Sequence, residues 1–207
     1  MNRNIFAICG PDGSGKTVLT ENIGIMDYNV IYCGKKSNTN LLLTRLLNTM
    51  YIYLKKHRPS IMSELFLYFL LYPVEYFDYL IKLISAKKHY KTIIYERYIV
   101  DRMWRKFYKG RRRKLFKVLD NIIFIIYWLF FPKIEGYVFL IPESNVLYSR
   151  RADEYKSIED CKNVRNAYLD LSEKMKKKYN IIVIQEACSV TNMRNKVLDF
   201  IGEGVPE

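Results

Sequence analysis

The sequence predicts an α/β domain built around a five-stranded, mostly parallel β-sheet. Short apolar segments alternate along the chain with longer segments of helical periodicity. A length of 207 residues, 50% of them hydrophobic, suits one buried core. No linker rich in Gly, Ser or Pro divides the chain. We therefore expect a single domain over residues 1–207.

The strands are predicted from short apolar runs that end at turn-forming or charged residues. Because these runs are apolar throughout, they are typical of parallel strands that helices cover on both faces. Ligands bind such sheets at the carboxyl ends of the strands, so the residues there are the first candidates for function. In order along the chain, the expected strands cover residues 4–9, 29–33, 92–95, 136–141 and 181–184.

The helices are predicted from apolar residues that recur every three or four positions. Ser60 is expected to cap a long apolar helix over residues 61–84, and Pro73 is expected to interrupt it. The clearest periodicity is that of Leu43, Leu46, Leu47, Met50 and Leu54, and that of Val164, Tyr168, Leu171 and Met175. The other expected helices cover residues 17–26, 40–56, 159–179 and 191–201.

The strongest motif lies between the first predicted strand and the first predicted helix. There the sequence GPDGSGKT matches the phosphate-loop pattern G-x-x-x-x-G-K-[ST] in full. Glycines let consecutive backbone N–H groups point at phosphate oxygens, and the positive end of the following helix favours the same anion. The lysine supplies a mobile charge for the β- and γ-phosphates, and the threonine hydroxyl can ligate Mg²⁺. The residues expected to bind ATP are Gly10, Gly13, Ser14, Gly15, Lys16 and Thr17.

This phosphate loop, with aspartate at its third position, resembles that of the thymidylate kinase-like family of P-loop nucleoside and nucleotide kinases. The segment KTIIYERY, residues 91–98, resembles the family's strand that ends in Asp-Arg-Tyr. Residues 136–143 and 148–151 resemble its fourth strand and arginine-bearing lid, and residues 181–189 resemble its last strand and adenine loop. Residues 35–90 and 103–135 match poorly. The resemblance implies a three-layer αβα P-loop kinase fold with strand order 2-3-1-4-5 and a helical lid at about residues 149–160.

The resemblance also implies roles for individual residues. Arg97 is expected to contact the transferring or acceptor phosphate, and Glu96 to support Mg²⁺ or a substrate hydroxyl. The alternative for this pair is a surface salt bridge. Arg150 or Arg151 is expected to reach the donor phosphates when the lid closes. The alternative for these arginines is a basic helix end that complements its own dipole.

The same resemblance places the acceptor and the adenine. Asp12 is expected to bind the 3′-hydroxyl of the acceptor sugar, although aspartate is also a common turn residue. Ala187 is expected near the adenine. Phe69, with Phe66 and Tyr72 beside it in sequence, is a candidate to stack on the acceptor base. Aromatic residues at this spacing are also typical of a core.

Two departures from the family concern the acceptor. The family carries Glu-Pro and a nearby arginine after its second strand, but residues 32–36 here read YCGKK. No carboxylate is therefore available there to deprotonate a nucleoside hydroxyl, whereas a phosphate acceptor is already ionised. The family's third helix carries an arginine that reads thymine, and residues 65–76 contain none.

The charge of the chain is strongly positive: 34 Lys and Arg exceed 21 Asp and Glu, which gives a net charge of +13. Basic and aromatic residues are interleaved in the segment from Arg105 to Lys117, and the apolar run 122–131 follows it. This combination is consistent with docking on an anionic membrane, with nucleic-acid binding, or with a solvated surface next to a buried helix. The apolar run is too short to cross a bilayer as a helix.

The cysteines and histidines exclude other classes of protein. The four cysteines are scattered without a C-x-x-C pair, and the chain has only two histidines, so a zinc site is not expected. The scattered cysteines and the lack of a signal-peptide pattern indicate a reducing, cytoplasmic location, and the basic segment leaves peripheral membrane attachment open.

The motifs together predict an ATP- and Mg²⁺-dependent kinase that phosphorylates a nucleoside monophosphate. The best guess for the reaction is dTMP + ATP to dTDP + ADP. The alternative is an ATP-binding regulatory protein that uses the basic segment to contact a membrane or nucleic acid. The resemblance also suggests a homodimer.

Overall fold

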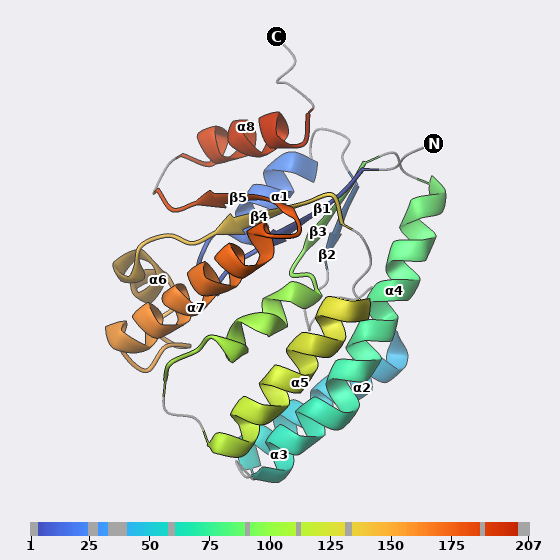
Figure 1. Cartoon of the computed structure of the whole chain (residues 1–207), viewed down its shortest axis with the longest axis vertical. Helices are drawn as coiled ribbons and strands as arrows, with labels where there is room; N and C mark the ends of the chain where they lie inside the picture. The colour runs from blue at the N-terminus through green and yellow to red at the C-terminus, as the bar shows by residue number, and fades with distance from the viewer. Residues whose placement is uncertain are drawn as a thin grey trace. The chain divides into compact units, whose positions relative to one another are not determined.

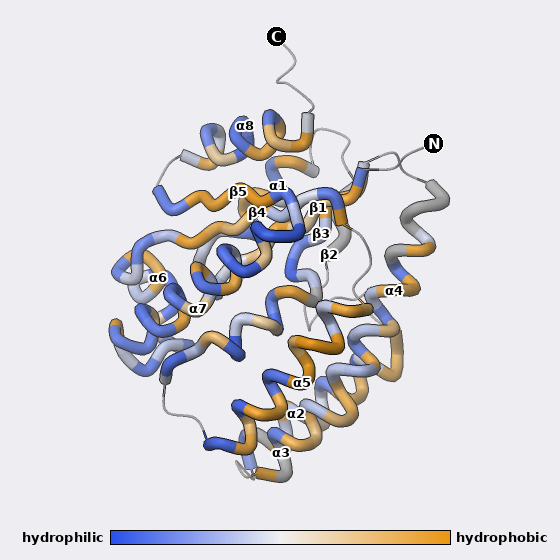
Figure 2. The backbone as a smooth tube through the Cα atoms, viewed as in Figure 1, coloured by the Kyte–Doolittle hydropathy of each residue, from blue (hydrophilic) through white to orange (hydrophobic). Residues whose placement is uncertain are grey.

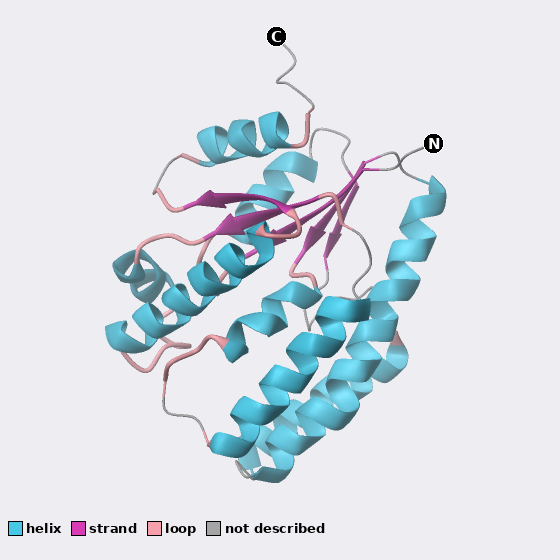
Figure 3. Cartoon of the chain, viewed as in Figure 1, coloured by secondary structure: helices cyan, strands magenta, loops and turns pink. Residues whose placement is uncertain are grey.

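The computed structural model describes residues 4–24, 29–32, 41–57, 61–89, 92–110, 113–130, 134–186 and 189–202. By its contacts the chain divides into two compact units, each considered by itself. One unit comprises Met1–Ile31 and Tyr90–Glu207, and the other comprises Tyr32–His89. Figure 3 shows helices and strands alternating along the first unit, whereas the second consists of helices.

A β-sheet with the strand order β2-β3-β1-β4-β5 forms the centre of the first unit. Parallel pairing joins β3 to β1, β1 to β4 and β4 to β5. The strands are β1 (Asn4–Cys9), β2 (Asn29–Tyr32), β3 (Thr92–Glu96), β4 (Gly136–Leu140) and β5 (Asn180–Ile184). The α/β architecture that the sequence predicts is therefore present. The strands β3, β1, β4 and β5 pair in parallel.

Helices cover the two faces of this sheet, which gives three layers (Figure 1). Helices α1 (Lys16–Gly24) and α8 (Val190–Phe200) pack on one face. The other helices of this unit are α5 (Lys114–Phe130), α6 (Ser144–Arg150), α7 (Ile158–Lys176) and the 3₁₀ helix η2 (Ile99–Lys106). The sequence predicts the positions of α1, α7 and α8, but it does not predict η2.

The two faces of the sheet have different cores. Aliphatic residues of β1, β3 and β4 meet Leu19 and Ile23 of α1 and Val197 and Leu198 of α8. The opposite face is aromatic: the ring centroids of Tyr95 and Tyr98 lie 5.1 Å apart, and those of Tyr137 and Tyr179 lie 5.2 Å apart. Hydrophobic colour follows the strands in Figure 2, in agreement with burial on both faces.

The second unit contains α2 (Leu42–His57), α3 (Ile61–Phe66), the π-helical turn η1 (Leu67–Leu71) and α4 (Tyr72–His89). The predicted interruption at Pro73 is present: the α-helix gives way to the π-helical turn, and α4 starts at Tyr72, directly before Pro73. A proline in a helix clashes with the carbonyl four residues earlier. Here the widened turn just before Pro73, in which the Tyr72 N–H donates to the Leu67 carbonyl, accommodates the ring. The predicted cap Ser60 lies outside the described residues.

The expected lid is mostly not helical. Helix α6 ends at Arg150, residues 151–157 form turns and coil, and α7 begins at Ile158. The Ser157 hydroxyl accepts a hydrogen bond from the Asp160 N–H at 3.1 Å, so Ser157 caps α7 and prevents one continuous helix.

The apolar run 122–131 lies largely within α5, and among the described residues no helix is long and apolar enough to span a membrane.

Candidate active site

The phosphate loop leaves the sheet at the end of β1 and leads into α1. Gly10, Gly13 and Gly15 have φ angles of 150°, 85° and 91°, a region that strongly favours glycine. A Cβ atom at Gly10 would lie 2.2 Å from the Leu140 carbonyl oxygen. The glycines of the motif are thus required by backbone conformation, and at Gly10 also by the close approach of β4.

Lys16 lies inside the loop and is buried. Its ammonium donates to the carbonyls of Gly10 and Pro11, at 2.5 Å and 2.7 Å, and lies 3.4 Å from the Ser14 hydroxyl. Burial lowers the pKa of this ammonium, and the charge of Asp101 is the strongest influence in the opposite direction. The Lys16 ammonium therefore lies at the centre of the loop, where two backbone carbonyls accept its hydrogen bonds. Phosphate oxygens can replace these carbonyls as acceptors.

The end of β3 brings a carboxylate to the start of α1. Glu96 is 2% exposed, and its two oxygens accept hydrogen bonds from the hydroxyls of Thr17 and Thr20, both at 2.7 Å. Glu96 and Thr17 were predicted from the sequence, whereas Thr20 was not. Its signal was the spacing of three residues after Thr17, which places both hydroxyls on one face of the helix.

Arg97 follows Glu96 and has the left-handed φ angle of 57°, which is uncommon for a residue with a side chain. Its N–H donates to the Ile8 carbonyl at 3.2 Å, so backbone pairing with β1 stabilises this conformation. Its guanidinium lies 2.6 Å from the Asp12 carboxylate. Strained backbone of this kind is concentrated at functional sites, which supports a functional role for Arg97.

The ion pair with Arg97 alters the chemistry of Asp12. Burial by itself would raise the pKa of the Asp12 carboxyl, but the charges of Arg97 and Lys16 outweigh it and lower the pKa to about 2. Asp12 is therefore an ionised hydrogen-bond acceptor and a very weak base at neutral pH.

The end of α6 and the segment after it each donate one hydrogen bond to the phosphate loop. The Arg150 guanidinium donates to the Gly13 carbonyl at 3.2 Å, and the Tyr155 hydroxyl donates to the Asp12 carbonyl at 2.7 Å. The side chain of Arg151 instead pairs with Asp153 and Glu154. The two arginines, equivalent in the sequence analysis, therefore have different partners.

A further carboxylate, Asp101 of η2, was not predicted. Its Oδ1 accepts a hydrogen bond from the Gly10 N–H at 2.9 Å. Burial raises the pKa of the Asp101 carboxyl, although Lys16 and the Gly10 N–H act against this. Its only signal was an acidic residue in the segment after Arg97, and without η2 nothing in the sequence places this residue at the loop.

These residues surround a cleft of about 310 Å³ in the first unit. It is lined by Gly13–Val18 of the loop and α1, by Arg97, Arg150 and Arg151, and by Val190 and Met193 of α8. The structure therefore brings together the phosphate loop, the arginine at the end of β3 and both arginines at the end of α6.

The structure does not test the roles of two predicted residues. Ala187 lies outside the described residues. Phe69 belongs to η1 in the second unit, where it is 64% exposed, whereas its neighbour Tyr72 is 2% exposed and belongs to the core. The base-stacking role of Phe69 remains a prediction.

The donor groups near Lys16 fit Mg²⁺. This ion prefers oxygen ligands and is usually bound through one or two protein groups together with substrate phosphates and water. The Thr17 hydroxyl and the Glu96 carboxylate are such groups and lie side by side. Among the described residues no cluster of His, Cys, Asp and Glu could hold a metal without such help.

No protein-family model matches the chain, and no curated protein matches its sequence. Solved structures do match it. The thymidylate kinase of Candida albicans has a TM-score of 0.69 and 14% identity, with 97% of this chain and 91% of that chain covered. The deoxyadenosine kinase of M. mycoides with bound dATP has a TM-score of 0.62 and 13% identity, with 96% and 99% covered.

The chain therefore has the α/β fold of the P-loop nucleoside and nucleotide kinases. The resemblance found in the motifs is confirmed at this level. The similarity extends to a thymidylate kinase and a deoxyadenosine kinase alike, so the fold does not distinguish between these two acceptors.

Proposed function

We propose that this protein is an ATP-dependent kinase that transfers the γ-phosphoryl group to a nucleoside monophosphate, with dTMP as the acceptor to test first. One observation carries the proposal: the phosphate loop, Arg97 and Arg150 line a single cleft. Phosphoryl transfer depends on positioning the phosphates and on positive charge around the transferring oxygens. Both are supplied here by elements of one compact unit.

The residues of the candidate active site have distinct parts in this proposal. The N–H groups at the start of α1 bind the donor phosphates, because the first turn of a helix leaves them without intrahelical partners. Lys16 exchanges the Gly10 and Pro11 carbonyls for phosphate oxygens. Arg97 and Arg150 approach the transferring group from β3 and α6. Thr17 and Glu96 would hold Mg²⁺, which supplies neutralising charge on the β- and γ-phosphates when bound.

The state of the two predicted carboxylates, Asp12 and Glu96, favours an acceptor that already carries a phosphate. A nucleoside hydroxyl needs a base, and a useful base has a pKa near the working pH. Asp12 has a pKa of about 2 and is paired with Arg97. Both oxygens of Glu96 already accept hydrogen bonds. A monophosphate needs no such base, and Arg97 offers it a counter-charge. Asp12 retains its proposed role as an acceptor for the sugar hydroxyl.

The test is phosphoryl transfer from labelled ATP to a panel of nucleoside monophosphates and nucleosides. We expect transfer to at least one monophosphate, and loss of this transfer in Lys16→Ala. The matched control is Lys162→Ala, since Lys162 is an exposed lysine on α7 that does not line the cleft. A wild-type protein that binds ATP and phosphorylates no nucleotide or nucleoside would contradict the proposal.

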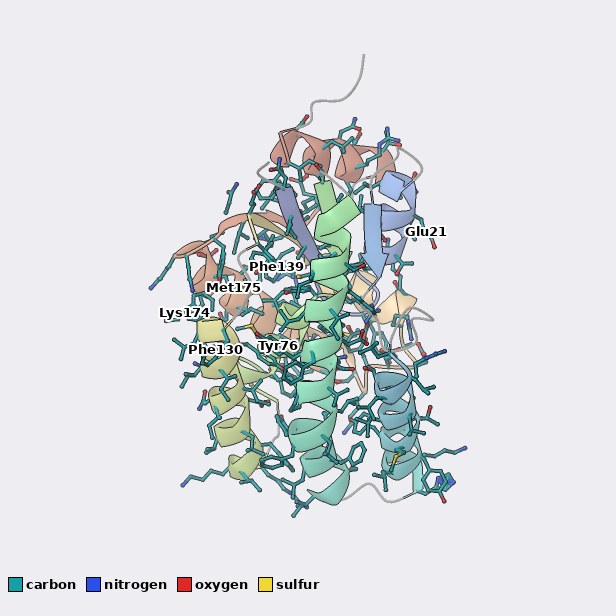
Figure 4. The ribbon with its side chains drawn as sticks, turned by 90° about the vertical axis from the view of Figure 1, so that its right-hand side faces the viewer. Glu21, Tyr76, Phe130, Phe139, Lys174 and Met175 are labelled. Atoms are coloured by element: carbon teal, nitrogen blue, oxygen red, sulfur yellow. The ribbon has the colours of Figure 1, made fainter. Side chains whose placement is uncertain are left out.

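A second candidate activity, contact with an anionic membrane, is favoured by α5. Its exposed residues include Leu115, Val118, Ile122, Ile125, Ile126, Leu129 and Phe130. Phe130, at the carboxyl end of the helix, is labelled in Figure 4 and is 68% exposed. Arg113, Lys114 and Lys117 are exposed at the amino end of the same helix. We propose that this surface docks on anionic lipid, since apolar and basic groups are combined there.

Vesicle co-sedimentation tests this second proposal. Wild type is expected to bind vesicles that contain phosphatidylserine and not neutral vesicles, and the double variant Lys114→Glu/Lys117→Glu is expected to lose binding. Dimerisation at the protein concentration used, without vesicle binding, would instead assign the α5 surface to a second copy of the chain. Binding to single-stranded DNA alone would assign it to nucleic acid. Either result contradicts the membrane proposal.

A further inference from the structure

The 3₁₀ helix η2 carries a carboxylate that acts on the phosphate loop from outside the motif. The Asp101 Oδ1 atom lies 2.9 Å from the Gly10 nitrogen, although the two residues are 91 positions apart in sequence. The carbonyl of the same glycine accepts from the Lys16 ammonium at 2.5 Å. Gly10 therefore links two hydrogen bonds, one from its N–H to the Asp101 carboxylate and one to its carbonyl from Lys16.

The position of Asp101 is fixed by the elements around it. Within η2, Val100 and Met103 are buried, and the ring of Trp104 stacks on that of Tyr168 of α7 at 5.8 Å. The Tyr168 hydroxyl donates to the Asp101 carbonyl at 3.4 Å. Just beyond η2, the Tyr108 hydroxyl donates to the Asp160 carboxylate of α7 at 2.5 Å. The carboxylate therefore approaches Gly10 from a rigid support.

Gly10 is the point at which this support can affect the phosphate loop. Its φ of 150° turns the chain out of β1, and the adjacent β4 leaves no space for a Cβ atom. The Gly10 N–H belongs to the Cys9–Gly10 peptide, and the carbonyl that accepts from Lys16 belongs to the next peptide plane. A fixed N–H therefore restricts this carbonyl through the φ and ψ angles of Gly10. Since η2 begins two residues after Arg97, the same element that follows the acceptor-side arginine contacts the donor-side loop.

We propose that Asp101 is a positioning residue for ATP binding: its hydrogen bond to the Gly10 N–H fixes the conformation in which the phosphate loop and Lys16 receive the triphosphate. This inference rests on the proposed function, since it assigns the loop to ATP. Asp101 itself need not touch the nucleotide. Its contribution passes through Gly10 and Lys16.

The experiment compares Asp101→Asn, which keeps an oxygen acceptor, with Asp101→Leu, which has a similar shape and no acceptor. The dissociation constants of Mg²⁺-free ATP and of inorganic tripolyphosphate are measured by calorimetry, and melting temperatures are recorded in parallel. We expect Leu to weaken both ligands about 10- to 100-fold, the range for loss of a hydrogen bond to a charged group. We expect Asn to stay within about threefold of wild type. The matched control, Asp170→Leu at an exposed position of α7, should bind like wild type.

Two results would overturn the inference. One is a folded Leu variant that melts at a lower temperature but binds both ligands as wild type does, because Asp101 would then support only the fold. The other is an Asn variant as impaired as Leu, because charge rather than the hydrogen bond would then be responsible. If the Leu variant does not fold, hydrogen exchange of the Gly10 amide in wild type and Asn is the measurement. Protection is expected in both, and rapid exchange in wild type would overturn the inference.

The failure of this inference differs from the failure of the proposed function. A wild-type protein that binds ATP and phosphorylates no acceptor contradicts the kinase proposal and leaves the binding comparison valid. A working kinase whose ATP affinity is insensitive to Asp101→Leu contradicts only the positioning role.

Discussion

At the scale of single residues, the arginines of the site differ in their partners: some pair with carboxylates, and another contacts the phosphate loop. Arg150 and Arg151 are adjacent in sequence, but only Arg150 donates to the phosphate loop. Arg151 is paired with Asp153 and Glu154, two and three residues further along the chain. A neutralised guanidinium has less charge to offer a phosphate.

The arginine pair gives the first prediction. Arg150→Ala is expected to lower kcat/KM for ATP by about 100-fold or more, a magnitude typical of a lost charge on the transferring group. Arg151→Ala is expected to lower it by less than about 10-fold. Steady-state kinetics with each variant make the comparison. A larger loss in Arg151→Ala would show that the segment rearranges so that Arg151 is the acting residue.

Gly10 gives the second prediction. Gly10→Ala combines a strained φ angle with a clash against the Leu140 carbonyl, so it is expected to cost more than about 3 kcal/mol in the free energy of unfolding. Gly202 has a positive φ of 76° and open space around it, so Gly202→Ala should cost only about 1 kcal/mol. Urea unfolding measures both. Equal losses would mean that β4 does not constrain Gly10.

Asp12 gives a prediction about pH. Its folded pKa of about 2 lies below the ordinary value of 3.8, so its ionised form stabilises the fold above the ordinary value. This stabilisation should disappear as pH falls through about 2. The carboxylate is 36% exposed, so we expect only about 1 kcal/mol. The difference in unfolding free energy between wild type and Asp12→Asn should be constant above about pH 5 and shrink below pH 4. A difference that grows on acidification would contradict the ion pair with Arg97.

At the scale of elements, the non-helical segment 151–157 is attached to the phosphate loop through Tyr155. This side chain is buried, and its hydroxyl donates to the Asp12 carbonyl at 2.7 Å. We propose that this contact helps to close the segment over the donor phosphates, although the segment is not a helix. Closure of such segments excludes water from the reacting groups.

Removal of this hydroxyl is the fourth prediction. Tyr155→Phe keeps the ring and loses the donor, so it is expected to raise the KM for ATP about 5- to 10-fold, in line with one neutral hydrogen bond. The change in melting temperature should be small. Tyr148→Phe, on the adjacent α6, is the matched control. An unchanged KM in Tyr155→Phe would show that the segment closes without this contact.

At the scale of the whole molecule, local pattern predicted the sheet and the phosphate loop well. The runs that form β1, β3, β4 and β5 are apolar, and GPDGSGKT has a backbone requirement that only its glycines satisfy. The sequence could not predict η2, because the 3₁₀ helix is stabilised by the stacking of Trp104 on Tyr168, a contact distant in sequence. Asp101 was missed for the same reason.

The errors have similar causes. The interruption at Pro73 was predicted, but its form was not, because propensity does not indicate a π-helical turn. The helical lid was wrong over 151–157 because the Ser157 cap starts a new helix. Arg150 and Arg151 differ in their side-chain partners, and these partners cannot be predicted from the spacing of residues in the sequence.

The central claim is that the acceptor already carries a phosphate. The most direct measurement is kcat/KM for thymidine monophosphate and for thymidine, side by side, with the same ATP concentration. We predict that the monophosphate is preferred by about 100-fold or more, because Asp12 and Glu96 are unsuited to deprotonate a hydroxyl. The purine monophosphate and nucleoside pair is measured alongside, so that base preference does not obscure the comparison. Preference for the nucleosides in both pairs would contradict the claim.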